Sequence, residues 1–206
     1  MNTKTIVFLL FVLLAGQKMM AQNLQELEMP ADQTALVLID IQMFYFEDGQ
    51  MSLHNPEKAS KKAGQLLEAF RSEGLEVIHV RHDIEKNAGI HPDVAPIAGE
   101  KVITKKKANS FAGTNLASYL EKKGMKHLVI AGMMTHMCVE ATARAASDMG
   151  HHVLVASDAC ATRDIKYQGE AIPARHVHLS TLASLEGTYG QVLSTKELRE
   201  MIESNE

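Results

Sequence analysis

The sequence is poor in several features that mark common classes of protein. It has only two cysteines in 206 residues, and they do not form a Cys-x-x-Cys pair. No Gly-x-Gly-x-x-Gly follows the first strand-like run, and the only dense basic run is 105–107, with the other charges of both signs interspersed. We therefore expect neither a dinucleotide-binding protein nor a nucleic-acid partner, and a dithiol redox protein is disfavoured.

The overall composition suits one globular α/β domain. The chain is 46% hydrophobic and 22% charged, with a formal net charge of -4. A chain of this length can bury a sizeable core, and nothing in its composition marks a boundary to a second large domain.

The N-terminal segment 1–21 differs in composition from the rest of the chain. Lys4 supplies a positive start, an apolar run covers 6–15, and Ala21 stands at a small-residue cleavage site. This pattern predicts a secretory signal peptide and a mature domain at 22–206 that is exported across the inner membrane to the periplasm. The run is short for a bilayer and no cysteine follows it to carry a lipid, so we expect no stable membrane anchor; a retained anchor is the alternative.

Strand-like and helix-like segments alternate along the mature chain. Apolar runs without polar alternation indicate strands buried on both faces, and short connections between strands and helices indicate a parallel sheet. The sequence thus predicts a three-layer Rossmann-like α/β fold, with a mostly parallel six-stranded sheet flanked by helices. Expected strands are 35–41, 76–81, 101–104, 127–131, 152–156 and 191–193; expected helices include 56–72, 115–123 and 139–149.

Three chemically active residues stand at the ends of predicted strands. Asp40 closes the first strand, Lys105 closes the third, and Cys138 follows the fourth. Because ligands bind at the carboxyl edge of such sheets, we expect these side chains to meet there. A carboxylate that shuttles a proton, an ammonium that stabilises negative charge and a thiol nucleophile together indicate acyl transfer.

The position of Cys138 bears on its charge and on its partners. A cysteine in the first turn of a helix is near unpaired backbone N–H groups and the positive end of the helix dipole, so we expect a thiolate. The other cysteine, Cys160, follows the predicted strand 152–156 and should lie near the same sheet edge. A bridge between the two cysteines, and a thiol redox function that uses them, therefore remain alternatives.

Three separated motifs in this order resemble the isochorismatase-like cysteine hydrolases. They are Asp40-Ile41-Gln42, Lys105 with Asn109-Ser110-Phe111, and the run 132–139 followed by 141–144. The resemblance covers about 35–193. It implies the family's hydrolase fold and a catalytic triad of Asp40, Lys105 and Cys138. It further implies a cis peptide bond between Met133 and Met134, an oxyanion hole formed by the backbone N–H groups of Met134 and Cys138, and a homo-oligomer of two or more subunits.

The presence of Cys138 favours one branch of the family's chemistry. Members that hydrolyse a vinyl ether can dispense with the cysteine, whereas the amidases and carbamoyl hydrolases use it as a nucleophile. We therefore expect hydrolysis of a C–N bond (amide, carbamoyl or lactam) in a small-molecule substrate through a Cys thioester, with isochorismatase-type vinyl ether hydrolysis as the alternative.

The sequence around the second predicted strand departs from the metal site of the nicotinamidases within this family. Those enzymes carry an Asp-x-His pair and a further His, whereas this chain has His82 before Asp83, with His91 further on. We therefore expect no metal and no cofactor, and we assign these residues to the pocket mouth; a metal near them is the alternative.

Polar and aromatic residues near the three motifs are candidates for the substrate pocket. We expect the histidine two residues before the cysteine to line the pocket rather than to form a Cys–His dyad. The residues assigned to substrate binding are Gln42, Tyr45, Phe46, Phe111 and His136.

Overall fold

The computed structural model describes residues 29–204. The predicted signal peptide at 1–21 lies outside this range. Within the described range, no helix is both long enough and apolar enough to cross a bilayer.

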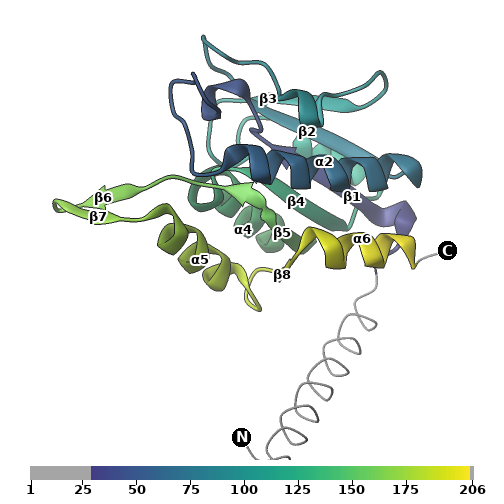
Figure 1. The fold of residues 1–206 in the computed structure, drawn as a ribbon. Coiled ribbons are helices and arrows are strands. Elements are labelled where there is room, and N and C mark those ends of the chain that lie inside the picture. The colour runs from purple at the N-terminus through teal and green to yellow at the C-terminus, as the bar shows by residue number, and fades with distance from the viewer. Residues whose placement is uncertain (1–28, 205–206) are drawn as a thin grey trace, which may run out of the picture.

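The core of the molecule is a parallel sheet of six strands in the order β3-β2-β1-β4-β5-β8. Helices cover both of its faces (Figure 1), which confirms the predicted three-layer fold. The strands are β1 (Thr34–Ile39), β2 (Glu76–His82), β3 (Lys101–Lys105), β4 (His127–Met133), β5 (His152–Ala161) and β8 (Gln191–Leu193). The helices are α2 (Pro56–Ser72), α3 (Leu116–Lys123), α4 (Glu140–Asp148), α5 (Ala174–Leu185) and α6 (Thr195–Glu203).

Alternate side chains of β1 show how the two layers are built. Leu36 and Leu38 pack in one apolar cluster with α2 and α6, whereas Val37 and Ile39 pack in a second cluster with α3, α4 and α5. All six residues of the strand are buried. The uninterrupted apolar run is therefore explained by a sheet that is covered on both sides.

Several helix ends follow the local signals in the sequence. Helix α2 has Pro56 in its first turn, and Gly74 just beyond its end takes a positive φ of 64°. Helix α6 begins with a capping box in which Ser194 and Glu197 each accept a hydrogen bond from the other's backbone N–H. Local sequence signals therefore set the two ends of α2 and the start of α6.

The structure adds elements that the sequence pattern did not predict. A π-helical turn, Thr135–Val139, precedes α4. Strands β6 (Ile165–Tyr167) and β7 (Glu170–Ile172) form an antiparallel hairpin that projects away from the sheet (Figure 1). Strand β5 runs to Ala161, five residues beyond the predicted 152–156, and its pairing with β8 ends at Ala156.

The two central strands approach very closely at Gly132 of β4. This glycine has a φ of 143°, and a Cβ atom placed on it would overlap the backbone carbonyl of Ile39. Only glycine fits such a contact. The close approach brings the end of β1, where Asp40 follows, next to the end of β4, where the turn to Cys138 begins.

Candidate active site

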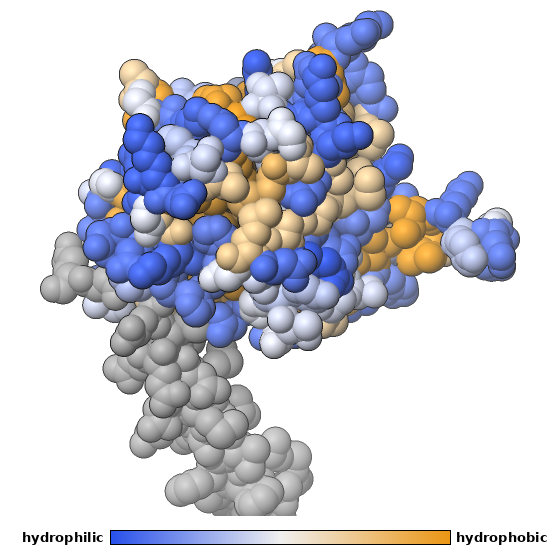
Figure 2. Space-filling view, turned by 180° about the vertical axis from the view of Figure 1, so that it is seen from behind, coloured by the Kyte–Doolittle hydropathy of each residue, from blue (hydrophilic) through white to orange (hydrophobic). Residues whose placement is uncertain are grey.

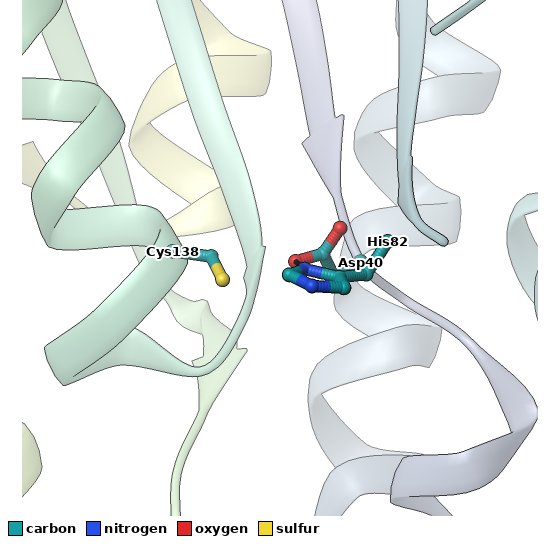
Figure 3. A group of neighbouring side chains, drawn as sticks. All are labelled: Asp40, His82 and Cys138. Carbon is teal, nitrogen blue, oxygen red and sulfur yellow. Dashed lines mark ion pairs between the residues drawn. The ribbon is translucent and has the colours of Figure 1, made fainter. Parts of the chain in front are cut away.

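Asp40, Lys105 and Cys138 meet at the carboxyl edge of the sheet, as their positions in the sequence predicted. Figure 3 shows Asp40 and Cys138 from opposite sides of this edge, with His82 beside them. The Nζ atom of Lys105 lies 2.6 Å from Oδ2 of Asp40 and 3.2 Å from Sγ of Cys138. All three residues are buried. One ammonium group thus bridges the carboxylate and the thiol in an environment that excludes most water.

The Lys105 ammonium has two further neighbours. It donates to the backbone carbonyl of Lys107 at 3.1 Å and contacts Nδ1 of His82, also at 3.1 Å. An ammonium can only donate, so Nδ1 of His82 is on the accepting side of this contact. These contacts hold the charged end of Lys105 at a fixed point between the other groups.

Asp40 is held by its backbone in an uncommon conformation. Its φ is 50°, its N–H donates to the carbonyl of Val80 at 2.8 Å, and its own carbonyl accepts from the N–H of Gln42 at 2.9 Å. Aspartate tolerates this left-handed region better than most residues. Its second carboxylate oxygen, Oδ1, is buried and has no hydrogen-bond partner within 29–204. An acceptor is therefore available for a proton.

The charge state of Cys138 corrects the expectation of a resting thiolate. Burial raises the pKa of this thiol to about 12, the Asp40 carboxylate raises it too, and the Lys105 ammonium only partly opposes them. The cost of burying a second negative charge beside Asp40 outweighs the helix-end effect that the sequence suggested. The raised pKa favours the thiol in the resting site, and the proton then has to leave as the sulfur attacks.

The second cysteine lies on β5, the strand next to β4, and is not joined to the first. Cys160 of β5 pairs with Gly132 of β4, and both Cys138 and Cys160 are free, buried thiols. Burial raises the pKa of Cys160 to about 12 as well. The bridge that the sequence left open is absent from the structure.

Gln42 occupies a different place from the substrate-binding one expected of it. It is fully buried, its Nε2 donates to the carbonyls of His82 and Ala88, and its Oε1 accepts from the N–H of His82. The donor and the acceptor of its side-chain amide are thus both bound to backbone groups. Gln42 fixes the end of β2, and through it the position of His82, rather than contacting a ligand.

The aromatic residues assigned to the pocket divide into two groups. Tyr45 is buried; burial raises the pKa of its phenol, and the charges of Cys138 and Asp40 raise it further. Phe46 stacks on His91 with ring centroids 3.9 Å apart. Phe111 instead packs in the core near His151, with centroids 6.2 Å apart. Because His151 precedes β5, this contact draws Phe111 toward the opposite edge of the sheet.

His136 is anchored beside the catalytic turn. Its Nδ1 lies 2.6 Å from Oγ1 of Thr162, and the ring is half-buried. Burial and the nearby Arg163 lower its pKa, while Glu140 raises it. The ring is bound to Thr162 and not to Cys138, so these two residues do not form a Cys–His dyad, and the substrate-lining role stays a prediction.

His82, which the sequence assigned only to the pocket mouth, belongs to the catalytic cluster. It is the last residue of β2, so the strand-end rule that identified Asp40 and Lys105 could have identified it as well. Ligand atoms of Asp40, His82 and Cys138 lie within 4.8 Å of one another, a spacing compatible with a metal ion. The Lys105 ammonium already contacts all three, however, and a metal would have to displace that charge.

Of the three residues named for the alternative metal site, only His82 is in this cluster. Asp83 lies near the surface lysine Lys106, with 3.5 Å between the charged atoms. His91 stacks on Phe46 and caps the short turn Pro92–Val94, accepting at Nδ1 from the N–H of Asp93. These separate contacts do not form a shared ligand set.

Comparison with known proteins places this site in a family. The Isochorismatase domain model matches residues 34–186. An uncharacterised isochorismatase family protein of Bacillus subtilis, YddQ, is 43% identical over 174 residues, which are 79% of this chain and 97% of that protein. The crystal structure of an isochorismatase-type hydrolase from Oleispira antarctica superposes with a TM-score of 0.80 at 40% identity, covering 84% of this chain and 99% of that one.

A relative with a named activity is more distant. Streptothricin hydrolase of Streptomyces noursei is 32% identical over 140 residues, which are 64% of this chain and 50% of that enzyme. The family model spans most of the chain, and the six-stranded sheet matches that of the solved relatives. The chain belongs to the isochorismatase family of hydrolases.

Proposed function

We propose that this hydrolase cleaves a C–N bond of a small molecule through a thioester on Cys138. The observation that carries the proposal is the single buried ammonium of Lys105, which lies within hydrogen-bonding distance of both Asp40 and Cys138. A nucleophile, a base and a fixed positive charge in contact are the parts that acyl transfer requires. A relative named for the hydrolysis of streptothricin supports a small-molecule substrate.

The first half of the reaction forms the thioester. Asp40 accepts the thiol proton as Sγ of Cys138 attacks the carbonyl carbon, and Lys105 offsets the negative charge that develops. The backbone N–H groups of Met134 and Cys138 are the proposed donors to the oxyanion; the cis peptide bond between Met133 and Met134 is present. The C–N bond then breaks, and the leaving nitrogen takes the proton from Asp40.

The second half of the reaction consumes one water. Asp40, again a carboxylate, removes a proton from the water as its oxygen attacks the thioester carbonyl. The C–S bond breaks, the acid product leaves, and Sγ of Cys138 recovers the proton. The raised pKa of Cys138 suits this cycle, in which the thiol gives its proton to Asp40 as it attacks and regains a proton when the C–S bond breaks.

The alternative reaction, hydrolysis of a vinyl ether, gives no covalent adduct. Intact-protein mass spectrometry with a panel of amides, carbamoyl compounds and lactams therefore tests the proposal. We expect an acyl adduct on the wild type and on Cys160→Ala, and none on Cys138→Ala. Turnover that survives in Cys138→Ala would contradict a thioester mechanism.

Export of the protein is a separate proposal that rests on the sequence of 1–21. N-terminal sequencing of the protein recovered from the native host tests it. A mature chain that begins at Gln22, in the periplasmic fraction, is the expected result, and a chain that keeps 1–21 in the membrane fraction would contradict it.

Assembly into a homo-oligomer is supported by the projecting hairpin β6–β7. Two strands alone are marginally stable in water, and the hairpin carries an apolar stretch next to a hydrophilic tip (Figure 2). Ile165 and Ile172 face each other across it, and Tyr167 is 69% exposed. Light scattering should find two or more subunits for the wild type, and fewer for Tyr167→Lys with Ile172→Lys. A wild-type monomer would refute the proposal.

A further inference from the structure

A cavity of ≈ 340 Å³ lies where β5 continues beyond its last pairing with β8. Its walls come from the end of β5, from the first turn of α2 and from the first turn of α5. Asp40, Lys105 and Cys138 do not line it, so it is separate from the reacting atoms. A sheet edge that is left unpaired beside two helix starts leaves a space that no side chain fills.

The wall of this cavity is rich in positive and potentially positive side chains. Lys58 of α2 and Arg175 of α5 line it from opposite sides, and both are exposed. Neither forms an ion pair or a side-chain hydrogen bond in the part of the chain that the structure describes. His54 also lines the wall, and its ring has no hydrogen-bond partner among residues 29–204; three side chains that can donate thus face the cavity without a partner in that range.

The single carboxylate in the wall does not neutralise these groups. Oδ1 of Asp158 accepts hydrogen bonds from the N–H and the hydroxyl of Thr195, each at 2.7 Å, and Oδ2 lies 3.5 Å from Lys62. The Asp158 carboxylate is therefore already bound to Thr195 at the start of α6 and paired with Lys62, and neither of these residues lines the cavity. The first turn of α2 adds the positive end of a helix dipole to the same space, whereas at the start of α5 the N–H of Ala174 already donates to Oδ1 of Asp164 at 2.7 Å.

We propose that this cavity is a second binding site, which takes a small oxyanion with a carboxylate or phosphate group between Lys58 and Arg175. Arginine offers a planar pair of donors and lysine a point charge, the combination that suits a compact oxyanion. The volume accommodates a small metabolite rather than a macromolecule.

Two hydrogen bonds place this site directly behind the catalytic turn. His178, which lines the cavity, has its Nδ1 2.9 Å from Oγ1 of Thr135, and Thr162, also in the wall, holds His136. A bound anion would thus lie one layer of side chains away from the turn that carries Cys138. The site goes beyond the proposed hydrolysis and can be tested without any substrate.

Calorimetric titration of the purified protein with inorganic phosphate, and separately with succinate, tests the proposal. We expect one or both to bind at neutral pH and low salt, and Lys58→Gln with Arg175→Gln to weaken that binding by about 10-fold or more. Two single variants serve as controls: Lys61→Gln on α2 and Lys166→Gln on the hairpin. Each removes an exposed cation outside the cavity and should leave the affinity unchanged.

Binding of phosphate alone would assign the site to a phosphate group, and binding of succinate to a carboxylate; either supports the proposal. Failure of both probes to bind the wild type would overturn it, as would equal affinity in the double variant and in Lys61→Gln.

Cys160 provides an independent readout, because it lines the cavity and is the only thiol left in Cys138→Ala. Because burial raises the pKa of Cys160 to about 12, its alkylation by iodoacetamide in that background is followed at pH 9–10, where more thiolate forms, and the anion that binds should slow it. The protection should disappear when Lys58→Gln and Arg175→Gln are added. Protection that persists in this variant would place the anion elsewhere.

Discussion

Nζ of Lys105 and Oδ2 of Asp40 are 2.6 Å apart in a pair whose side chains have no exposure to solvent. Such a pair contributes little net stability, because the desolvation of both charges offsets their attraction. Its contact with the Cys138 thiol through Lys105, and the unpartnered Oδ1 of Asp40, instead suit a role in catalysis. Breaking the pair should therefore affect stability and activity in separable ways.

Asp40→Asn should destabilise the protein by about 3–5 kcal/mol, because it leaves a buried ammonium without its anion. Adding Lys105→Met should recover much of that loss, since the unpaired charge is gone. Hydrolysis should stay lost in both, lowered by at least about 100-fold. Urea unfolding and steady-state kinetics check this, and a double variant less stable than Asp40→Asn would contradict it.

The Cys138 thiol should react slowly with alkylating reagents near neutral pH. Its pKa is raised to about 12, so the thiolate fraction keeps growing above pH 9. Iodoacetamide rates for Cys160→Ala, which leaves Cys138 as the only thiol, should rise throughout pH 7–10. Rates that level off below pH 8 would show a resting thiolate.

The same shift links Cys138 to stability at alkaline pH. A folded-state pKa above the unfolded value of about 9 means that the thiol stabilises the fold below pH 9, and that this contribution is lost as pH rises toward 12. The unfolding free energy of the wild type should thus fall more steeply above pH 9 than that of Cys138→Ala. Parallel curves would contradict this.

Gln42→Ala should lower the free energy of unfolding by about 2–4 kcal/mol, because it leaves the backbone N–H and C=O of His82 and the carbonyl of Ala88 without their hydrogen-bond partner. Activity should also fall, since His82 would lose its fixed position beside Lys105. Thermal unfolding measures the first effect. Gln65→Ala, at an exposed position of α2, is the control and should shift the melting temperature very little.

Gly132→Ala should prevent formation of the native fold. The added Cβ would overlap the carbonyl of Ile39, in the closest part of the β1–β4 contact. Gly89→Ala is the matched control, because its nearest neighbour would be Cγ of Met43 at 4.0 Å. Circular dichroism and the yield of folded protein distinguish the two. A folded and active Gly132→Ala would contradict the close approach.

Glu100 should make the protein sensitive to acid. Burial acts to raise its pKa, but hydrogen bonds from Arg71, the Ile97 N–H and His79 lower it to about 2. Stability from this group is complete above the usual value of 4.5 and is lost as pH falls toward 2. Glu100→Gln should cost about 3 kcal/mol at pH 7 and much less at pH 2–3, as measured by urea unfolding. An equal loss at both pH values would contradict this.

The sequence predicted the features that depend on local pattern. Buried runs and the strand-end rule placed Asp40, Lys105 and Cys138 at one edge, and Pro56 and Gly74 marked the ends of α2. Features that depend on tertiary contacts were missed. The charge state of Cys138 depends on how deeply it is buried beside Asp40, which no local pattern encodes.

The role of Gln42 shows the same limit. Its partners are 40 and 46 residues away along the chain, so a glutamine next to a catalytic aspartate reads as a ligand contact until the fold is known. The hairpin β6–β7 was missed for another reason. Its strands are three residues each, too short to show alternation.

The order of the strands has a consequence for how activity relates to folding. The acid-base residue, the ammonium and the nucleophile belong to segments 65 and 33 residues apart, and they meet only because β3, β2, β1 and β4 lie side by side. A sheet that lacks any one of these four strands does not contain the site. Hydrolysis should therefore report on the cooperative assembly of all four strands, and an intermediate that lacks any one of them should be inert however native its remaining helices are.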